Sequence, residues 1–136
     1  MKKKIICFTI NSYSQAKEII VESKKNTIFP IIYIKYHIAN GFGIEWIKAL
    51  NRILIDSFSN KSFKIFVDCN NNFSLATQLI GEQIHYLKLK ADPLTLKKIN
   101  DIAKKNRVLL NPKIRIVDLS NIKKISKKIS LIESRG

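Results

Sequence analysis

The sequence predicts an α/β protein, a three-layer, doubly wound domain whose central sheet has five mostly parallel strands. Short apolar runs rich in Ile, Val and Phe alternate along the chain with amphipathic segments of helical period. The loops between them are short, as in βα units that are joined by right-handed crossovers. We therefore expect five strands and five helices with strand order 2-1-3-4-5, and a half-barrel of the same units is the alternative.

Length and composition indicate one folded domain over residues 1–136. The 136 residues are 46% hydrophobic and 26% charged, and no stretch rich in Pro, Gly or Ser divides them. No apolar run approaches the roughly 20 residues that a membrane-spanning helix needs, and no long apolar region follows the charged start. We expect a cytoplasmic, unprocessed protein with no membrane partner. Cys7 and Cys69 are expected to be small buried thiols in a reducing compartment.

The first βα unit is read from residues 4–10, a β-rich run that ends at Asn11 and Ser12. A side-chain oxygen of Ser12 or Ser14 can cap the helix that follows, because it accepts from the free amides of the first turn. The second strand is expected at residues 28–36, where the apolar run is nearly continuous, as in a strand covered on both faces.

The middle of the chain carries the clearest pattern. Residues 37–40 are expected to form a loop, and residues 44–58 a long helix with apolar side chains at three- and four-residue spacing. Residues 63–67 then read as a buried strand, residues 68–72 as a polar turn, and residues 73–84 as an amphipathic helix.

The last third repeats the unit. A strand at residues 86–90 alternates lysine with leucine, so one of its faces is expected to be more exposed. Asp92 is expected to cap the next helix, with Pro93 at its first position, where the missing N–H costs nothing. Residues 107–110 are expected to form the fifth strand, and residues 114–117 to extend it or add another.

A formal charge of +15 raises the possibility of a nucleic-acid partner, but lysine supplies most of it and the arginines number four: Arg52, Arg107, Arg115 and Arg135. Arginine is the preferred residue for bidentate phosphate recognition, so we expect a solvated lysine surface and no nucleic-acid partner. The final helix, capped by Asp118 or Ser120, should turn its isoleucines inward and its lysines outward.

Candidate ligand-binding residues follow the predicted strands, because ligands of open α/β sheets bind beyond the carboxyl ends of the strands. Helix capping and contact with water also explain polar residues at these positions. Gly41 and Gly43 either bring backbone amides to a phosphate or serve a turn with positive φ. Neither histidine is near Cys69 in sequence to act as its base. The candidates are Asn11, Ser12, His37, Gly41, Gly43, Asp68, Cys69, Asn70, Lys90 and Asn111.

Up to about residue 118 the expected flavodoxin-like pattern resembles the receiver domains of response regulators. Asp68 lies where the resemblance implies a phosphoacceptor. Asn11-Ser12 replaces the family's acidic pair, Lys90-Ala91 its Ser/Thr-Ala, and Asn111-Pro112 its Lys-Pro. Without two carboxylates Mg²⁺ loses most of its hard oxygen ligands. Phosphoryl transfer then loses the cation that neutralises its transition state, so we do not expect a working receiver.

The chain is also similar to small uncharacterised bacterial α/β proteins, through Gly43-Ile44-Glu45-Trp46, Val67-Asp68-Cys69 and Ser74-Leu75-Ala76. We expect a small non-catalytic module that binds or interacts, with no cofactor and no metal, and with a protein partner, a second copy of itself or an anionic small molecule. One alternative is a protein that binds or acts on a small anionic or phosphorylated ligand at the strand ends, including a divergent receiver-like domain. A lysine-driven nucleic-acid binder is the other.

Overall fold

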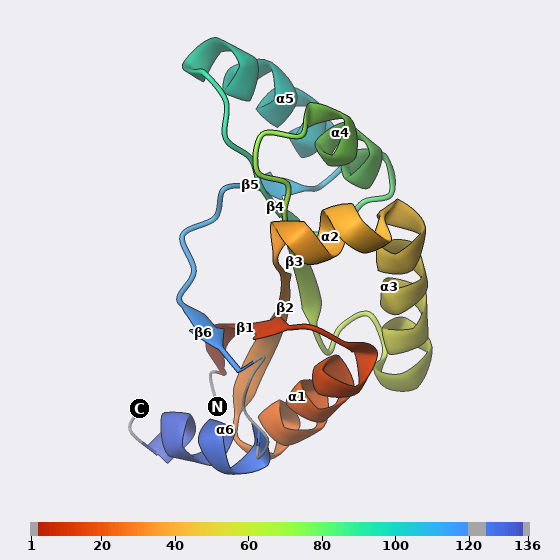
Figure 1. Cartoon of the computed structure of the whole chain (residues 1–136). Helices are drawn as coiled ribbons and strands as arrows, with labels where there is room; N and C mark the ends of the chain where they lie inside the picture. Colours follow the sequence, from red (N-terminus) through yellow and green to blue (C-terminus); the bar gives the residue numbers. More distant parts are fainter. Residues whose placement is uncertain (1–2, 120–124, 135–136) are drawn as a thin grey trace.

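In the residues that the structure describes, 3–119 and 125–134, the chain forms six parallel strands in one sheet and six helices (Figure 1). The structure is a computed structural model. The predicted α/β class with a parallel sheet is confirmed. The strands are β1 (Lys4–Ile10), β2 (Ile28–Ile34), β3 (Lys64–Asp68), β4 (Tyr86–Lys88), β5 (Leu109–Leu110) and β6 (Ile116–Asp118). The helices are α1 (Tyr13–Lys25), α2 (Tyr36–Phe42), α3 (Ile44–Phe58), α4 (Phe73–Gly81), α5 (Pro93–Lys105) and α6 (Ile125–Ser134).

The strand order is β5-β4-β3-β2-β1-β6, so the predicted order 2-1-3-4-5 is wrong. Strands β1 to β5 follow one another across the sheet in chain order, each beside the strand before it. Strand β6 then pairs with the free edge of β1. The local pattern specifies each strand and helix, whereas the side on which the next strand pairs depends on long-range packing. The observed succession of β1 to β5 is that of the half-barrel alternative.

The connection from β5 to β6 shows that the sheet is curved. Residues 111–115 join these two strands, which lie at opposite ends of the strand order. In a flat sheet, five spacings of about 4.8 Å would separate them by about 24 Å. The chain from Leu110 to Ile116 spans at most about 21 Å, so the two edges must curl toward each other. This connecting segment runs along the left of the sheet in Figure 1, and α1, α3 and α4 lie on the other side.

The two faces of the sheet carry separate hydrophobic clusters. The larger cluster joins one face of β1 to β4 with the apolar sides of the helices, and its members extend from Ile6 to Ile132. Successive side chains of a strand point to opposite faces, so the residues between these core positions face the connecting segment. On that face Cys7, Ile31, Tyr33 and Phe66 form a smaller cluster, and Ile114 packs against it.

The predicted helix starts agree with the structure where the cap lies within the described residues. The Ser12 hydroxyl accepts from the backbone N–H of Gln15 at 3.2 Å, and the Asp92 carboxylate accepts from the N–H of Thr95 at 3.1 Å. Pro93 occupies the first turn of α5, as predicted. Each cap satisfies an amide that has no partner within its helix.

Helix α4 ends three residues before the predicted Ile84. Gln83 adopts the left-handed conformation with φ 58°, and its N–H donates to the carbonyl of Ile80. The N–H of Ile84 donates to the carbonyl of Leu79 at 3.1 Å, so the two bonds form a Schellman cap. Because Ile84 and Leu79 are both buried, tertiary packing stabilises this ending without a glycine.

Residues 37–40, predicted as a loop, lie in helix α2. Ala39 is buried, and Tyr36 and Ile38 pack against the larger cluster. A helix of seven residues is too short to be stable by itself in water. Packing on the core therefore stabilises it, which explains why periodicity did not reveal it.

The last helix covers the core as predicted. Ile125, Ile129 and Ile132 belong to the larger cluster, and Lys127 is exposed. Asp118 lies in β6 and is not the cap of α6, and the other predicted cap, Ser120, lies outside the described residues. None of the described helices is long and apolar enough to cross a membrane.

Candidate functional site

Polar side chains gather at the carboxyl ends of the strands, on the sheet face that the connecting segment crosses. Strand register places Thr9 between Tyr33 and Asp118, and it places Asp68 beside Lys88. Side chains two residues apart on a strand share a face. Thr9, Tyr33 and Asp118 therefore form one row across the strands, and Asp68 and Lys88 form the next row on the same face. We call this group the polar edge, and it comprises Tyr33, Lys35, Asp68, Lys88 and Asp118.

Tyr33 and Asp68 form a hydrogen bond between neighbouring strands. The Tyr33 hydroxyl donates to Asp68 Oδ2 at 3.1 Å, and the backbone N–H of Asn70 donates to Oδ1 at 2.8 Å. Tyr33 is 6% exposed, and its ring meets that of Phe66 edge to face with centroids 5.0 Å apart. Burial raises the pKa of Tyr33 well above its usual value, and the charge of Asp68 raises it further. The phenol is therefore a neutral donor, and both carboxylate oxygens of Asp68 already accept a hydrogen bond.

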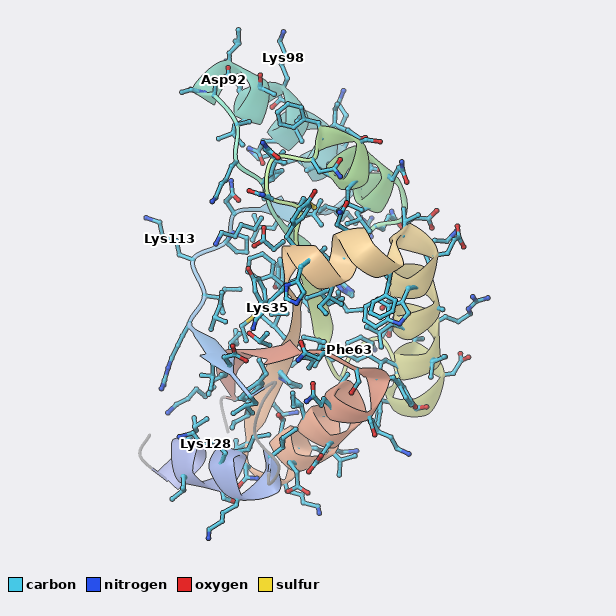
Figure 2. The ribbon with its side chains drawn as sticks, viewed as in Figure 1. Lys35, Phe63, Asp92, Lys98, Lys113 and Lys128 are labelled. Atoms are coloured by element: carbon cyan, nitrogen blue, oxygen red, sulfur yellow. The ribbon has the colours of Figure 1, made fainter. Side chains whose placement is uncertain are left out.

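Lys35 and Asp118 connect the end of β2 with the end of β6. Lys35 Nζ lies 3.0 Å from Asp118 Oδ2, and the side chains are 34% and 49% exposed. Figure 2 shows Lys35 near the centre of the molecule, whereas Lys113 of the connecting segment extends away from it. An ion pair at this exposure contributes little free energy, so Lys35 can exchange Asp118 for a bound anion at low cost.

The ends of β3, β4 and β5 are fixed to one another. The backbone N–H of Lys90 donates to the carbonyl of Asn70 at 2.7 Å. The Asn111 side chain accepts from the N–H of Leu89 at 2.8 Å and donates to its carbonyl at 3.1 Å. Lys88 is half-buried and Lys90 is exposed, and neither forms an ion pair within 4.0 Å with another described residue. These strand ends form a fixed platform that carries two lysines.

Asn11 and Ser12 do not lie beside Asp68. The predicted order would have made β1 and β3 neighbours, but β2 lies between them. The Asn11 backbone N–H donates to Gln15 Oε1 at 2.6 Å, and the Ser12 hydroxyl caps α1. Both residues therefore serve the start of α1, and Tyr33 of β2 is the side chain that reaches Asp68.

His37, Gly41 and Gly43 belong to α2 and its end. His37 and Gly41 are exposed on the helix. Gly43 has φ 84° at the junction of α2 and α3, and its N–H donates to the carbonyl of Ala39 at 2.9 Å. This conformation is one that residues other than glycine seldom adopt. The turn explanation of Gly43 is confirmed, and its amide is already engaged.

Cys69 follows Asp68 and is fully buried. Burial raises the pKa of the Cys69 thiol to about 12, and the charge of Asp68 contributes to the rise. Burial likewise raises the pKa of the Cys7 thiol to about 12. A reactive cysteine needs a lowered pKa and a base within hydrogen-bond reach. Both thiols are therefore protonated at neutral pH, as expected of the predicted buried thiols.

His85 has a structural bond at the other end of the sheet. Its Nδ1 accepts from the backbone N–H of Ile65 at 3.0 Å. Burial lowers the pKa of His85, and the nearby charge of Lys64 lowers it further. The imidazole is thus a neutral acceptor that helps hold β3 to the segment before β4.

Sequence reasoning missed four members of the polar edge: Tyr33, Lys35, Lys88 and Asp118. The signal that could have found them is the two-residue period at the strand ends, where Tyr33 and Lys35 share one face as Phe66 and Asp68 do. An apolar run of seven residues in β2 obscured this alternation.

Among the described residues, no three His, Cys, Asp or Glu side chains are grouped so that they could hold a metal ion. Comparisons of the chain with protein-family models, with curated proteins and with solved structures found no match. The function is therefore inferred from the geometry of this chain.

Proposed function

We propose that this chain is a small, non-catalytic α/β binding module that holds a small anionic ligand at the polar edge. The observation that best supports this proposal is the state of the charged groups there. Both carboxylates already accept hydrogen bonds from the chain itself, Asp68 from Tyr33 and Asn70, and Asp118 from Lys35. The ammonium groups of Lys88, in the polar edge, and of Lys90, two residues beyond it in the chain, have no such partner among the described residues.

The groups left to meet a ligand are therefore donors. An ammonium group donates up to three hydrogen bonds and accepts none. A carboxylate or phosphate is the complementary partner, since an ionised oxygen accepts short, strong bonds from cationic donors. Lys35 adds a third ammonium group when it exchanges Asp118 for the ligand. The rigid ends of β3, β4 and β5 support binding without a large ordering cost.

The same geometry favours binding over catalysis. Tyr33 and Cys69 are held in their neutral forms by burial. General acid–base catalysis needs a group whose pKa lies near the working pH, and nucleophilic catalysis needs an activated nucleophile. The raised pKa values of Tyr33 and Cys69 meet neither condition.

Titration of isotope-labelled protein with inorganic phosphate, followed by amide NMR spectra, tests the proposal. The amide signals of Asn70, Lys88 and Lys90 should shift together and saturate. Lys88→Gln should weaken phosphate binding about two- to fivefold, the range of one exposed ion pair. Lys98→Gln is the matched control, because Lys98 projects from α5 at the far end of the molecule (Figure 2). Equal affinity in the two variants would contradict the proposal.

A receiver-like enzyme is the main rival and has a different signature. We expect incubation with Mg²⁺ and acetyl phosphate to leave the mass of the protein unchanged, because both oxygens of Asp68 are engaged. An increase by one phosphoryl group that disappears in Asp68→Asn would refute the non-catalytic proposal and make the chain a divergent signalling domain.

A further inference from the structure

A concave feature lies at the opposite edge of the sheet from the polar edge, where β1 and β2 begin. It is a groove of about 600 Å³, lined by the last turns of α1 and α3, by the start of β2, by the residue before β1 and by the loop after α3. This volume falls in the range of roughly 300–1,000 Å³ that is typical of small-molecule sites. We call it the basic groove, after the four lysines that line it: Lys3, Lys24, Lys25 and Lys61.

The floor of the basic groove is apolar. Ile20, Ile28 and Pro30 line it and are buried, and Phe58 is half-buried beside them. Val21 also lines the groove and is 36% exposed. Such a floor offers a ligand apolar surface to cover, and removal of that surface from water favours binding.

The charge of the groove is not balanced from within. None of its described lining residues is acidic. Lys25 pairs with Glu22 at 3.5 Å, but the Lys25 side chain is 67% exposed, so the pair is weak. Lys24 and Lys25 lie in the last turn of α1, where they complement the helix dipole. Lys3 and Lys61 lie outside any helix, so the dipole does not account for them.

Backbone contacts hold Lys3 and Lys61 at the groove. The N–H of Lys4 donates to the carbonyl of Thr27 at 3.2 Å, which places the preceding Lys3 beside the turn from α1 to β2. The N–H of Lys61 donates to the Ser59 hydroxyl at 3.2 Å, and the Ser62 hydroxyl donates to the carbonyl of Phe58. The loop that carries Lys61 is therefore fixed before any ligand arrives.

We infer that the basic groove binds a small amphipathic organic anion. The carboxylate or phosphate of the ligand lies among the lysines, and its alkyl or aryl body covers the apolar floor. An inorganic anion lacks the body and an uncharged alcohol lacks the head, so neither makes both sets of contacts. This site is separate from the polar edge and does not depend on the function proposed there.

The test compares octanoate with octanol, which has a tail of similar length and no charge, and with inorganic phosphate, which has charge and no tail. We expect octanoate to shift the amide NMR signals of Val21, Lys24 and Ser62 in a saturable way. Octanol and phosphate should each shift these three signals at least about tenfold more weakly. Equal shifts by octanoate and octanol, or octanoate shifts confined to Asn70 and Lys90, would overturn the inference.

Variants identify the contribution of the lysines and of the floor. Lys3→Gln/Lys61→Gln should weaken octanoate binding about tenfold, since each exposed ion pair contributes up to a factor of about five. Lys97→Gln/Lys98→Gln on α5 makes the same change of net charge and should leave the affinity unchanged. Val21→Glu, on an exposed helical position, should abolish octanoate binding without lowering Tm. Unaltered octanoate affinity in Val21→Glu, or equal losses in the two lysine pairs, would refute the site.

Discussion

Tyr33→Phe is the most direct probe of the polar edge. The change removes the hydroxyl that donates to Asp68 Oδ2 at 3.1 Å and keeps the ring that packs on Phe66. A hydrogen bond to a charged group contributes about 1.5–3 kcal/mol. Asp68 is half-buried, so water replaces part of the lost bond. We therefore expect the free energy of unfolding to fall by about 1.5 kcal/mol and Tm by about 3–6 °C.

Urea unfolding of the variant and of Tyr86→Phe, followed by circular dichroism, measures this loss. Tyr86 lies on β4, on the other side of β3 from Tyr33, and its ring also meets Phe66, so the second variant makes the same chemical change without removing the bond to Asp68. Tyr86→Phe should cost less than about 0.5 kcal/mol, as a change at a half-exposed site usually does. A loss in Tyr33→Phe no larger than in Tyr86→Phe would show that the bond to Asp68 does not stabilise the fold.

The pH dependence gives an independent check on Tyr33. Its pKa is raised in the folded state, so the folded chain retains a proton that the unfolded chain releases near pH 10. Tyr33 therefore contributes full stability below about pH 10, and this contribution is lost as the pH rises above that value. In Tyr33→Phe the loss of stability above pH 10 should be smaller than in the wild type.

Four further predictions concern other parts of the chain. Ile125→Ala should cost about 2–5 kcal/mol in urea unfolding, because Ile125 is 2% exposed, whereas a loss below about 0.5 kcal/mol would make α6 peripheral. The lowered pKa of His85 predicts that stability falls as the pH drops below about 6.5; His85→Gln should flatten that dependence, and an unchanged profile would contradict the role of the imidazole. Asp68→Asn should cost about 1 kcal/mol or less, because asparagine keeps an acceptor for the Asn70 amide; a larger loss would show that the charge is required. Duplex DNA should bind weakly, without sequence preference, and be released by moderate salt, and a nanomolar Kd at physiological salt would restore the nucleic-acid reading.

The elements of the fold could be predicted from the sequence because their signals are local. Helix α3 agrees with the residues 44–58 expected from apolar spacing, and Ser12 and Asp92 act as the expected caps. A cap or a helical stripe depends on residues three or four positions apart. Such signals survive in the sequence whatever the rest of the chain does.

The bond that fixes the Asp68 carboxylate in its own turn is also local. Asp68 is the last residue of β3, and its carboxylate accepts from the N–H of Asn70, two residues away. Aspartate and asparagine commonly form such short-range bonds in turns.

The meeting of Tyr33 with Asp68, and of Lys35 with Asp118, was decided only by the tertiary structure. These pairs are separated by 35 and 83 residues in the chain, and they depend on β2 lying between β1 and β3. A βα unit has the same internal pattern whether the next strand pairs on its left or on its right. The choice is made by the packing of all the helices on one curved sheet, which no window of sequence contains.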